Sequence, residues 1–306
     1  MKVLLAIDGS DCSKEILTLA SDMKCPDGTE LLVISAVDFL EPLPSLEGVK
    51  QKEIEAIEKM VHKCVEDLRT AHPNVTVSGV VADGYATDEI LNSCKDWEPD
   101  LVMVGSHGRS GLDFLFFGSV SRTVLLEAPC AVRIVRRSTR AHNPSGAYNV
   151  ILALEHSEHA EQLIEHVLNS PWSERTNFRC IHVVRDTPES TLSEPEGGFT
   201  QSLKAHYDNL VAGRLAWLEA ATIRLNDRLG RTAATAEILR GEPRKVILDL
   251  AKDWPADLIL VGSHGRRGIE RAVLGSVSEA VATHASCSVE MTRLKSLKPQ
   301  KVHIIV

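Results

Sequence analysis

The sequence predicts an α/β fold: two tandem Rossmann-like or flavodoxin-like domains, each with a five-stranded parallel sheet flanked by helices. Apolar runs of strand length alternate along the chain with longer amphipathic segments. This alternation is typical of parallel sheets with right-handed crossovers. A glycine-rich unit also follows an apolar run in each half of the chain. The 306 residues are enough to build two hydrophobic cores.

The first half contains strand-like runs separated by helical patterns. Ser10 or Asp11 is placed to cap the helix after the first run, because both side chains accept hydrogen bonds from free N–H groups. A long helix over 49–71 carries apolar residues at three- and four-residue steps. Further helices are expected over 88–96 and after Gly118. The expected strands are 3–7, 31–37, 75–81, 101–104 and 131–135.

The second half repeats this plan. Helices are expected over 160–168 and 202–229, after Pro243 and after Gly275. Segment 186–198 is rich in Pro, Glu, Ser and Gly without periodicity, which predicts a loop. The expected strands are 148–154, 178–184, 233–239, 258–261 and 289–292.

A polar stretch with Pro and Gly separates the two halves. We expect a first domain over 1–138, a linker over 139–147, a second domain over 148–295 and a tail over 296–306. The tail ends in the apolar run 301–306, an extra strand candidate that we do not assign to a sheet.

Composition excludes several classes of function. A net charge of −8 and a pI near 5.9 argue against general binding to nucleic acid or to anionic membranes. No apolar stretch is long enough to span a membrane. The first apolar run meets Asp8 too early for a signal peptide. Seven cysteines without a CxxC pair predict reduced thiols, and therefore a cytoplasmic protein.

The glycine-rich unit has the chemistry of a phosphate cradle. Strand 101–104 leads into Gly105-Ser106-His107-Gly108-Arg109, and after the nine residues 109–117 a helix opens with Gly118-Ser119-Val120-Ser121. Glycines let the backbone approach a ligand, and the free N–H groups of a helix N-terminus attract anions. The second copy reads Gly262-Ser263-His264-Gly265-Arg266 and then Gly275-Ser276-Val277-Ser278. The differences 262 − 105, 265 − 108 and 275 − 118 all equal 157.

Glycine, two residues, glycine, nine residues, then glycine and serine resembles the ATP-binding signature of the universal stress protein family. The resemblance runs from Met1 to about Arg293 and implies a tandem member with two such domains. In that family the loop glycines, the Gly-Ser helix start and an Asp after the first strand surround ATP. The resemblance therefore implies a site residue at Asp8, which aligns with Glu155 at an offset of 147.

Each candidate residue also has a structural explanation. Asp8 would contact ribose or a metal, or would cap a helix. Arg109 and Arg266 would neutralise phosphate or lie on the solvated surface. His107 and His264 are better explained as loop histidines than as metal ligands or acid/base groups, because no partner ligands lie at metal spacing.

The resemblance further implies that backbone groups at the ends of the second strands recognise adenine. We expect no catalytic residues and no dedicated metal ligands. The residues expected to surround ATP, with or without Mg²⁺, are Asp8, Val37, Gly105, His107, Gly108, Arg109, Gly118, Ser119, Val120, Ser121, Glu155, Val184, Gly262, His264, Gly265, Arg266, Gly275, Ser276, Val277 and Ser278.

The expected function is that of an ATP-binding stress-response regulator that acts through nucleotide binding rather than turnover. One alternative is a slow ATPase or autophosphorylating enzyme that uses Ser119, Ser121 and Asp8. Another is a nucleotide-free module that binds a protein partner. No GxxxxGK[ST] motif is present, no GxGxxG follows the first strand, and no Ser/His/Asp or Cys/His set can be assigned.

Two further expectations concern how the halves relate. Strands 131–135 and 289–292 would each leave an unpaired sheet edge. The resemblance to the family implies that these two strands pair with each other across a twofold axis. We therefore expect an intramolecular pseudo-dimer and leave a homodimer of the whole chain open. The two sites should be unequal, with the first tighter, because Glu155-His156 replaces Asp8-Gly9.

Overall fold

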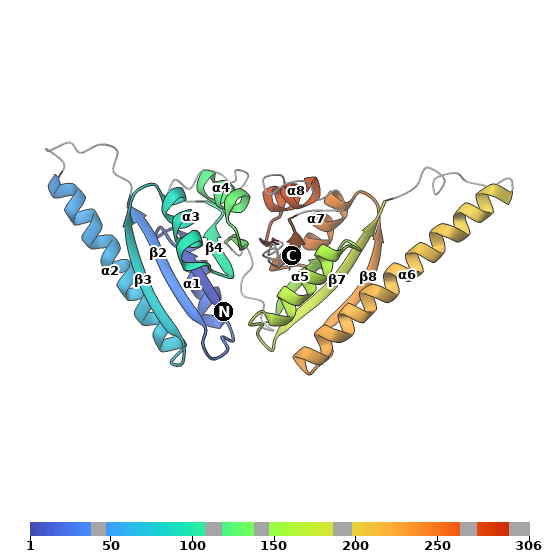
Figure 1. Cartoon of the computed structure of the whole chain (residues 1–306), viewed down its shortest axis with the longest axis horizontal. Coiled ribbons are helices and arrows are strands. Elements are labelled where there is room, and N and C mark those ends of the chain that lie inside the picture. Colours follow the sequence, from blue (N-terminus) through green and yellow to red (C-terminus); the bar gives the residue numbers. More distant parts are fainter. Residues whose placement is uncertain (38–46, 108–117, 138–146, 186–197, 264–273, 294–306) are drawn as a thin grey trace, which may run out of the picture.

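The two halves of the chain form one continuous sheet (Figure 1). The computed structural model describes residues 1–37, 47–107, 118–137, 147–185, 198–263 and 274–293. Its strand order is β3-β2-β1-β4-β5-β10-β9-β6-β7-β8. The α/β fold class is confirmed, although the two five-stranded sheets that the sequence predicts are joined edge to edge.

The elements of the first half follow the predicted order. They are β1 (Lys2–Ala6), α1 (Asp11–Asp22), β2 (Glu30–Val37), α2 (Glu47–Ala71), β3 (Thr76–Asp83), α3 (Ala86–Trp97), β4 (Leu101–Gly105), α4 (Ser119–Glu127) and β5 (Ala131–Val135).

The second half repeats the same order of strands and helices. Its elements are β6 (Tyr148–Ala153), α5 (Glu158–Asn169), β7 (Thr176–Val184), α6 (Gly198–Leu229), β8 (Ala234–Arg240), α7 (Pro243–Asp253), β9 (Leu258–Gly262), α8 (Ser276–His284) and β10 (Ser288–Thr292).

The junction between the halves is the antiparallel pair β5–β10. Val289 lies opposite Ile134, and Met291 lies opposite Val132. Every other pair of neighbouring strands in the described sheet is parallel. The predicted intramolecular pseudo-dimer is therefore confirmed. Pairing removes two exposed sheet edges, which is the physical reason that favours it.

The hydrophobic core differs between the two faces of the sheet. On one face, a single cluster runs through both halves and takes in buried residues of α3, α4, α7 and α8. On the other face, α1 and α2 cover one cluster and α5 and α6 cover another. The long helices α2 and α6 lie at the two outer flanks of the molecule (Figure 1). On that face the two halves therefore share one hydrophobic core.

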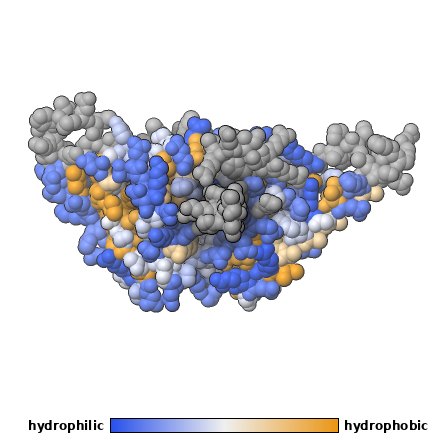
Figure 2. All heavy atoms as spheres, in the orientation of Figure 1, coloured by the Kyte–Doolittle hydropathy of each residue, from blue (hydrophilic) through white to orange (hydrophobic). Residues whose placement is uncertain are grey.

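The surface is mainly polar. Figure 2 shows hydrophilic residues over most of the visible face, with smaller hydrophobic patches among them. Among the described helices, none is both long and apolar enough to cross a membrane. All seven cysteines are free, and six of them are buried.

Some expectations fall outside the part of the chain that the structure describes. These are the loop over 186–197, most of the linker and the tail over 296–306. The domain bounds therefore stay a prediction. Within the described part, β3 extends to Asp83 instead of ending at Val81, because it pairs with β2 along its whole length up to Val37.

Candidate functional site

Those predicted site residues that the structure describes lie near the place where the strand order reverses. β1 lies between β2 and β4, and β6 lies between β7 and β9. In open α/β sheets, ligands bind outside the carboxyl ends of the strands at such a switch point. Asp8 follows β1, and Gly105 ends β4 at the same edge. Glu155 and Gly262 have the corresponding places beside β6 and β9.

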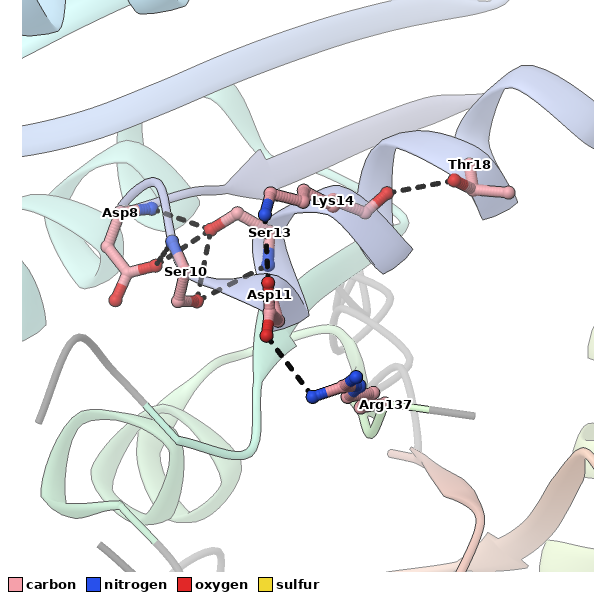
Figure 3. A network of polar contacts seen from close by, with 7 residues as sticks. All are labelled: Asp8, Ser10, Asp11, Ser13, Lys14, Thr18 and Arg137. Atoms are coloured by element: carbon pink, nitrogen blue, oxygen red, sulfur yellow. Dashed lines mark hydrogen bonds and ion pairs between the residues drawn. The ribbon is translucent and has the colours of Figure 1, made fainter. Parts of the chain in front are cut away.

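Asp8 is held in place by the first turn of α1 (Figure 3). Its Oδ1 accepts hydrogen bonds from the Ser13 hydroxyl at 2.7 Å and from the Ser10 backbone N–H at 2.9 Å. Its own N–H donates to Ser13 Oγ at 2.9 Å. Of the two predicted caps of α1, Ser10 and Asp11, the structure shows Ser10 as the N-cap. Asp8 therefore does not cap this helix. The turn depends on Gly9, whose φ of +82° lies in the region that favours glycine.

The glycine-rich unit anchors the start of α4 to the end of β4. The Gly118 N–H donates to the Ser106 carbonyl at 3.0 Å. The Ser121 hydroxyl donates to the Gly105 carbonyl at 2.5 Å. Gly118 is the N-cap of α4 and provides no side chain to its free N–H groups. Ser119, Val120 and Ser121 therefore present backbone N–H groups that have no partner among the described residues.

The second half has the same anchor. The Gly275 N–H donates to the Ser263 carbonyl at 2.9 Å, and the Ser278 hydroxyl donates to the Gly262 carbonyl at 2.6 Å. Helix α8 begins at Ser276 with Gly275 as its N-cap. The predicted helix starts in both halves are confirmed, and both have the geometry of an anion site.

Gly105 and Gly118 each lie where a side chain would be crowded, but by different neighbours. A Cβ on Gly105 would lie 2.7 Å from Cys12 Cβ, so this glycine lets α1 pack against the end of β4. A Cβ on Gly118 would lie 3.2 Å from the Ser106 carbonyl oxygen, close to the anchoring hydrogen bond. Packing of the protein itself therefore requires glycine at position 105, and at position 118 a side chain would crowd the anchoring carbonyl. The sequence pattern alone does not reveal these constraints.

The acidic position differs between the halves. Ala160 stands where the first half has Ser13, at the same offset of 147 that relates Glu155 to Asp8. The side chain that holds Asp8 is therefore replaced by alanine in the second half. The His156 ring packs edge-on against Trp217 in α6, with ring centroids 5.1 Å apart. Ser157 is the N-cap of α5, but its hydroxyl donates to the Glu155 carbonyl at 3.2 Å and does not accept from the first turn of the helix.

A cavity of about 770 Å³ opens at this edge of the second half. Its lining includes Glu155, Val184, Tyr207 and the first turn of α8 from Ser276 to Ser278. The Tyr207 hydroxyl is buried and has no hydrogen-bond partner among the described residues. The Arg240 guanidinium lies 5.4 Å from the centre of the Tyr207 ring. The volume falls in the range of about 300–1,000 Å³ that is usual for small-molecule sites.

The ends of the second strands are partly engaged within the protein. The Val37 carbonyl accepts a hydrogen bond from the Gly84 N–H, and the Val184 carbonyl accepts one from the Gly241 N–H, both at 3.0 Å. Each carbonyl oxygen has a second lone pair. Recognition of adenine at these two positions stays a prediction.

Several predicted residues belong to the loops between β4 and α4 and between β9 and α8. His107 Nδ1 lies 3.0 Å from Ser106 Oγ, which agrees with a loop histidine. Five predicted site residues lie outside the described residues: Gly108, Arg109, His264, Gly265 and Arg266.

Sequence reasoning missed two groups that position the site. Ser13 holds Asp8, and the carbonyls of Ser106 and Ser263 hold the helix starts. The signal that could have pointed to Ser106 and Ser263 is the repeat, because the two serines are 157 residues apart like the glycines around them. Nothing in the sequence pattern distinguished Ser13, because its contact with Asp8 depends on the turn at Gly9.

Comparisons with known proteins agree with this geometry. The model of the Universal stress protein family matches residues 1–136 and 147–293. The chain belongs to the universal stress protein family. Two family domains in tandem account for the repeat and for the pseudo-twofold sheet.

The relatives cover one or both halves. Universal stress protein Sll1388 from Synechocystis is 30% identical over 152 residues, which is 47% of this chain and 96% of that protein. A universal stress protein from Mycolicibacterium smegmatis is 27% identical over 241 residues, which is 78% of this chain and 75% of that protein.

A solved structure shares the fold over the whole chain. The crystal structure of a universal stress protein from Archaeoglobus fulgidus has a TM-score of 0.59 at 19% identity. It covers 95% of this chain and 96% of that one. The tandem arrangement of this universal stress protein is therefore also found in a solved structure.

Proposed function

We propose that this universal stress protein binds ATP at the carboxyl edge of each half and acts as a stress-response regulator through binding rather than turnover. The nucleotide-binding units are 1–138 and 148–295. Seven free thiols favour a reducing compartment, and we place the protein in the cytoplasm.

The observation that carries the proposal is the anchored helix start beside an acidic side chain. Three consecutive N–H groups, from Ser119 to Ser121, attract phosphate, and the dipole of α4 adds to that attraction. Asp8 lies at the neighbouring strand end and would contact the ribose hydroxyls or a Mg²⁺ ion that accompanies the phosphates. The lone hydroxyl of Tyr207 in the cavity of the second half offers a further polar contact.

Direct removal of one N–H group tests the phosphate contact. Ser119→Pro places proline at the first position of α4, where its fixed φ suits the helix. The substitution removes the N–H together with the Ser119 hydroxyl. Gly118 has φ −62° and ψ 146°, a conformation that the residue before a proline favours. We expect ATP affinity at the first site to fall roughly tenfold or more, because hydrogen bonds to charged groups contribute about 1.5–3 kcal/mol.

The matched control is Ser119→Ala, which removes the hydroxyl and keeps the N–H. Its affinity should stay close to that of the wild type, measured by calorimetric titration with ATP. Both variants should keep the wild-type melting temperature in the absence of nucleotide. Equal binding by a well-folded Ser119→Pro protein would contradict the proposal. Gly118→Val is a poorer test, because its side chain would press on the Ser106 carbonyl.

Two measurements separate binding from the other functions. Steady-state release of phosphate that disappears in Asp8→Ala would support a slow ATPase. Mass spectrometry of the purified protein identifies the adenine nucleotide that it carries. If no nucleotide co-purifies and ATP does not raise the melting temperature, a nucleotide-free partner-binding module is the better description.

A further inference from the structure

We propose that two pairs of opposite charges on the pseudo-twofold axis select the pairing of unlike halves and exclude the pairing of like halves. The partner that this surface accepts is the opposite half of this chain, either within the same molecule or in a second copy. This inference concerns assembly and does not depend on nucleotide binding.

The register of β5 and β10 identifies residues that lie on the axis. Arg133 lies directly opposite Glu290, and 290 − 133 equals the repeat offset of 157. A residue that faces its own repeat copy lies on the twofold axis. If two first halves paired in the same register, Arg133 would therefore face Arg133 of the other copy. If two second halves paired, Glu290 would face Glu290.

Several contacts of the junction are repeated from either side, so they do not discriminate between like and unlike pairing. Arg136 donates to the carbonyls of Ala282 and Thr283 at the end of α8. Arg293 donates to the carbonyls of Leu125 and Leu126 at the end of α4. These contacts are related by 157, since 293 − 136 and 282 − 125 both equal that number. Pairing of like halves would keep contacts of this kind.

The apolar residues on either side of Arg133 and Glu290 also fit both kinds of pairing. Val289 opposite Ile134 and Met291 opposite Val132 are repeat copies of the same apolar pair. Shape and apolar burial at the seam therefore allow both like and unlike pairing. The discrimination must come from residues whose character differs between the halves.

Arg133 and Glu290 differ in charge and are buried. Arg133 is 7% exposed and Glu290 is 0% exposed. Arg133 Nε donates to Glu290 Oε2 at 2.6 Å, and His166 Nε2 lies 2.5 Å from Glu290 Oε1. Two arginines at this place would lose the glutamate, and two glutamates would lose the arginine and keep only His166 as a partner. Either pairing would leave buried like charges in contact. That arrangement is strongly destabilising, because buried charges need to be paired.

A second pair on the axis repeats the pattern at the surface. Arg122 in α4 lies 4.0 Å from Glu279 in α8, and 279 − 122 again equals 157. At both positions the first half carries arginine and the second half carries glutamate. Like-charge contacts act as repulsive elements against the wrong partner, in addition to the attraction that favours the right one.

The test uses three full-length variants. The acidic variant is Arg122→Glu with Arg133→Glu, so that only glutamate occupies the axis. The basic variant is Glu279→Arg with Glu290→Arg. The exchanged variant carries all four changes and restores opposite charges with their places reversed.

We expect the acidic and basic variants each to melt at least about 5 °C below the wild type, since loss of buried pairing costs several kcal/mol. The exchanged variant should regain part of this loss. Full recovery is not expected, because His166 would then face an arginine. If the exchanged variant is no more stable than the acidic and basic variants, the charges do not set the pairing.

Mixing gives a second readout. After the acidic and basic variants are unfolded and refolded together, native mass spectrometry should show mixed dimers in excess of the statistical share. In such dimers each glutamate-bearing strand pairs with an arginine-bearing strand of the other chain. Differently tagged wild-type chains, treated in the same way, should give no such excess. Absence of an excess for the variant mixture would overturn the proposal.

If the buried substitutions prevent folding, the exposed pair answers the question alone. Arg122→Glu, Glu279→Arg and the double exchange form a double-mutant cycle on the surface. We expect each single change to lower the melting temperature and the double exchange to recover most of the loss. Additive losses would contradict a role of this pair in selection.

Discussion

At the residue scale, the most informative contact is that between Asp8 and Ser13. The Ser13 side chain is 4% exposed, and its hydroxyl both donates to the Asp8 carboxylate and accepts from the Asp8 N–H. The carboxylate is therefore oriented before any ligand arrives. Such pre-organisation lowers the entropic cost of binding.

We predict that Ser13→Ala weakens ATP binding at the first site and lowers stability by about 1 kcal/mol, the usual contribution of one hydrogen bond. Calorimetric titration in a Ser276→Pro background isolates the first site. The control is Thr18→Ala in the same helix. It removes an exposed hydroxyl that donates to the Lys14 carbonyl (Figure 3). Equal affinity in Ser13→Ala and Thr18→Ala would show that the orientation of Asp8 does not matter.

At the scale of elements, two glycines differ in how closely other parts of the protein pack against them. Gly105 lies where α1 meets β4, with Cys12 Cβ 2.7 Å from the place of a Cβ. Gly213 lies within α6, and outside its own helical backbone no atom of the described residues lies within 4 Å of that place. The same chemical change should therefore have opposite effects at these two positions.

We predict that Gly105→Ala destabilises the fold by about 1–3 kcal/mol through overpacking. Gly213→Ala should stabilise it by about 0.5–1 kcal/mol, because alanine loses less backbone entropy in a helix. Urea denaturation measures both free energies of unfolding. A neutral Gly105→Ala variant would mean that α1 moves freely relative to the end of β4.

The seam between β5 and β10 predicts a dependence of stability on pH. Burial alone would raise the pKa of Glu290, but the charge of Arg133 and the hydrogen bond to His166 outweigh burial and lower this pKa from 4.5 to about 2. Because the folded pKa is the lower one, the contribution of Glu290 is complete above pH 4.5 and is lost as pH falls toward 2.

We expect the free energy of unfolding of the wild type to fall over this pH range more steeply than that of Glu290→Gln. The variant should be less stable near neutral pH, since it leaves Arg133 buried without its counter-charge. Urea unfolding at a series of pH values between 2 and 7 gives both curves. Parallel curves would assign the acid sensitivity to other carboxyl groups.

At the scale of the whole molecule, the two halves share a fold but differ at their sites. The first half has an acidic residue held by Ser13 and Ser10, whereas alanine replaces Ser13 in the second half. The cavity of the second half is lined by Arg185 and Arg214, which add positive charge near the site. The orientation of the acidic side chain therefore favours ATP binding in the first half, whereas the positive charge of the arginines favours it in the second.

We predict that orientation is the stronger effect and that the first site binds ATP more tightly by roughly 1–3 kcal/mol. Titrations of Ser276→Pro and Ser119→Pro with ATP each report on the site that remains intact. A tighter second site would assign the control of affinity to the arginines instead. Arg185→Ala in the Ser119→Pro background would then identify the contribution of one arginine.

The sequence by itself determined the fold class, the tandem repeat and the places of the two helix starts. The physical reason is that these features are local. Alternation of apolar runs with amphipathic segments follows the geometry of single elements, and Gly118-Ser119 with Gly275-Ser276 marks a helix start without reference to distant residues.

Only the tertiary structure decided the register in which the two halves join and what each site residue contacts. The union of β5 with β10 brings Arg133 to Glu290 across 157 residues of chain, and no local pattern encodes that contact. The turn at Gly9 brings Ser13 to Asp8, and close packing with Cys12 explains Gly105. Such contacts depend on the packing of separate elements, because side chains meet only after the backbone has placed them.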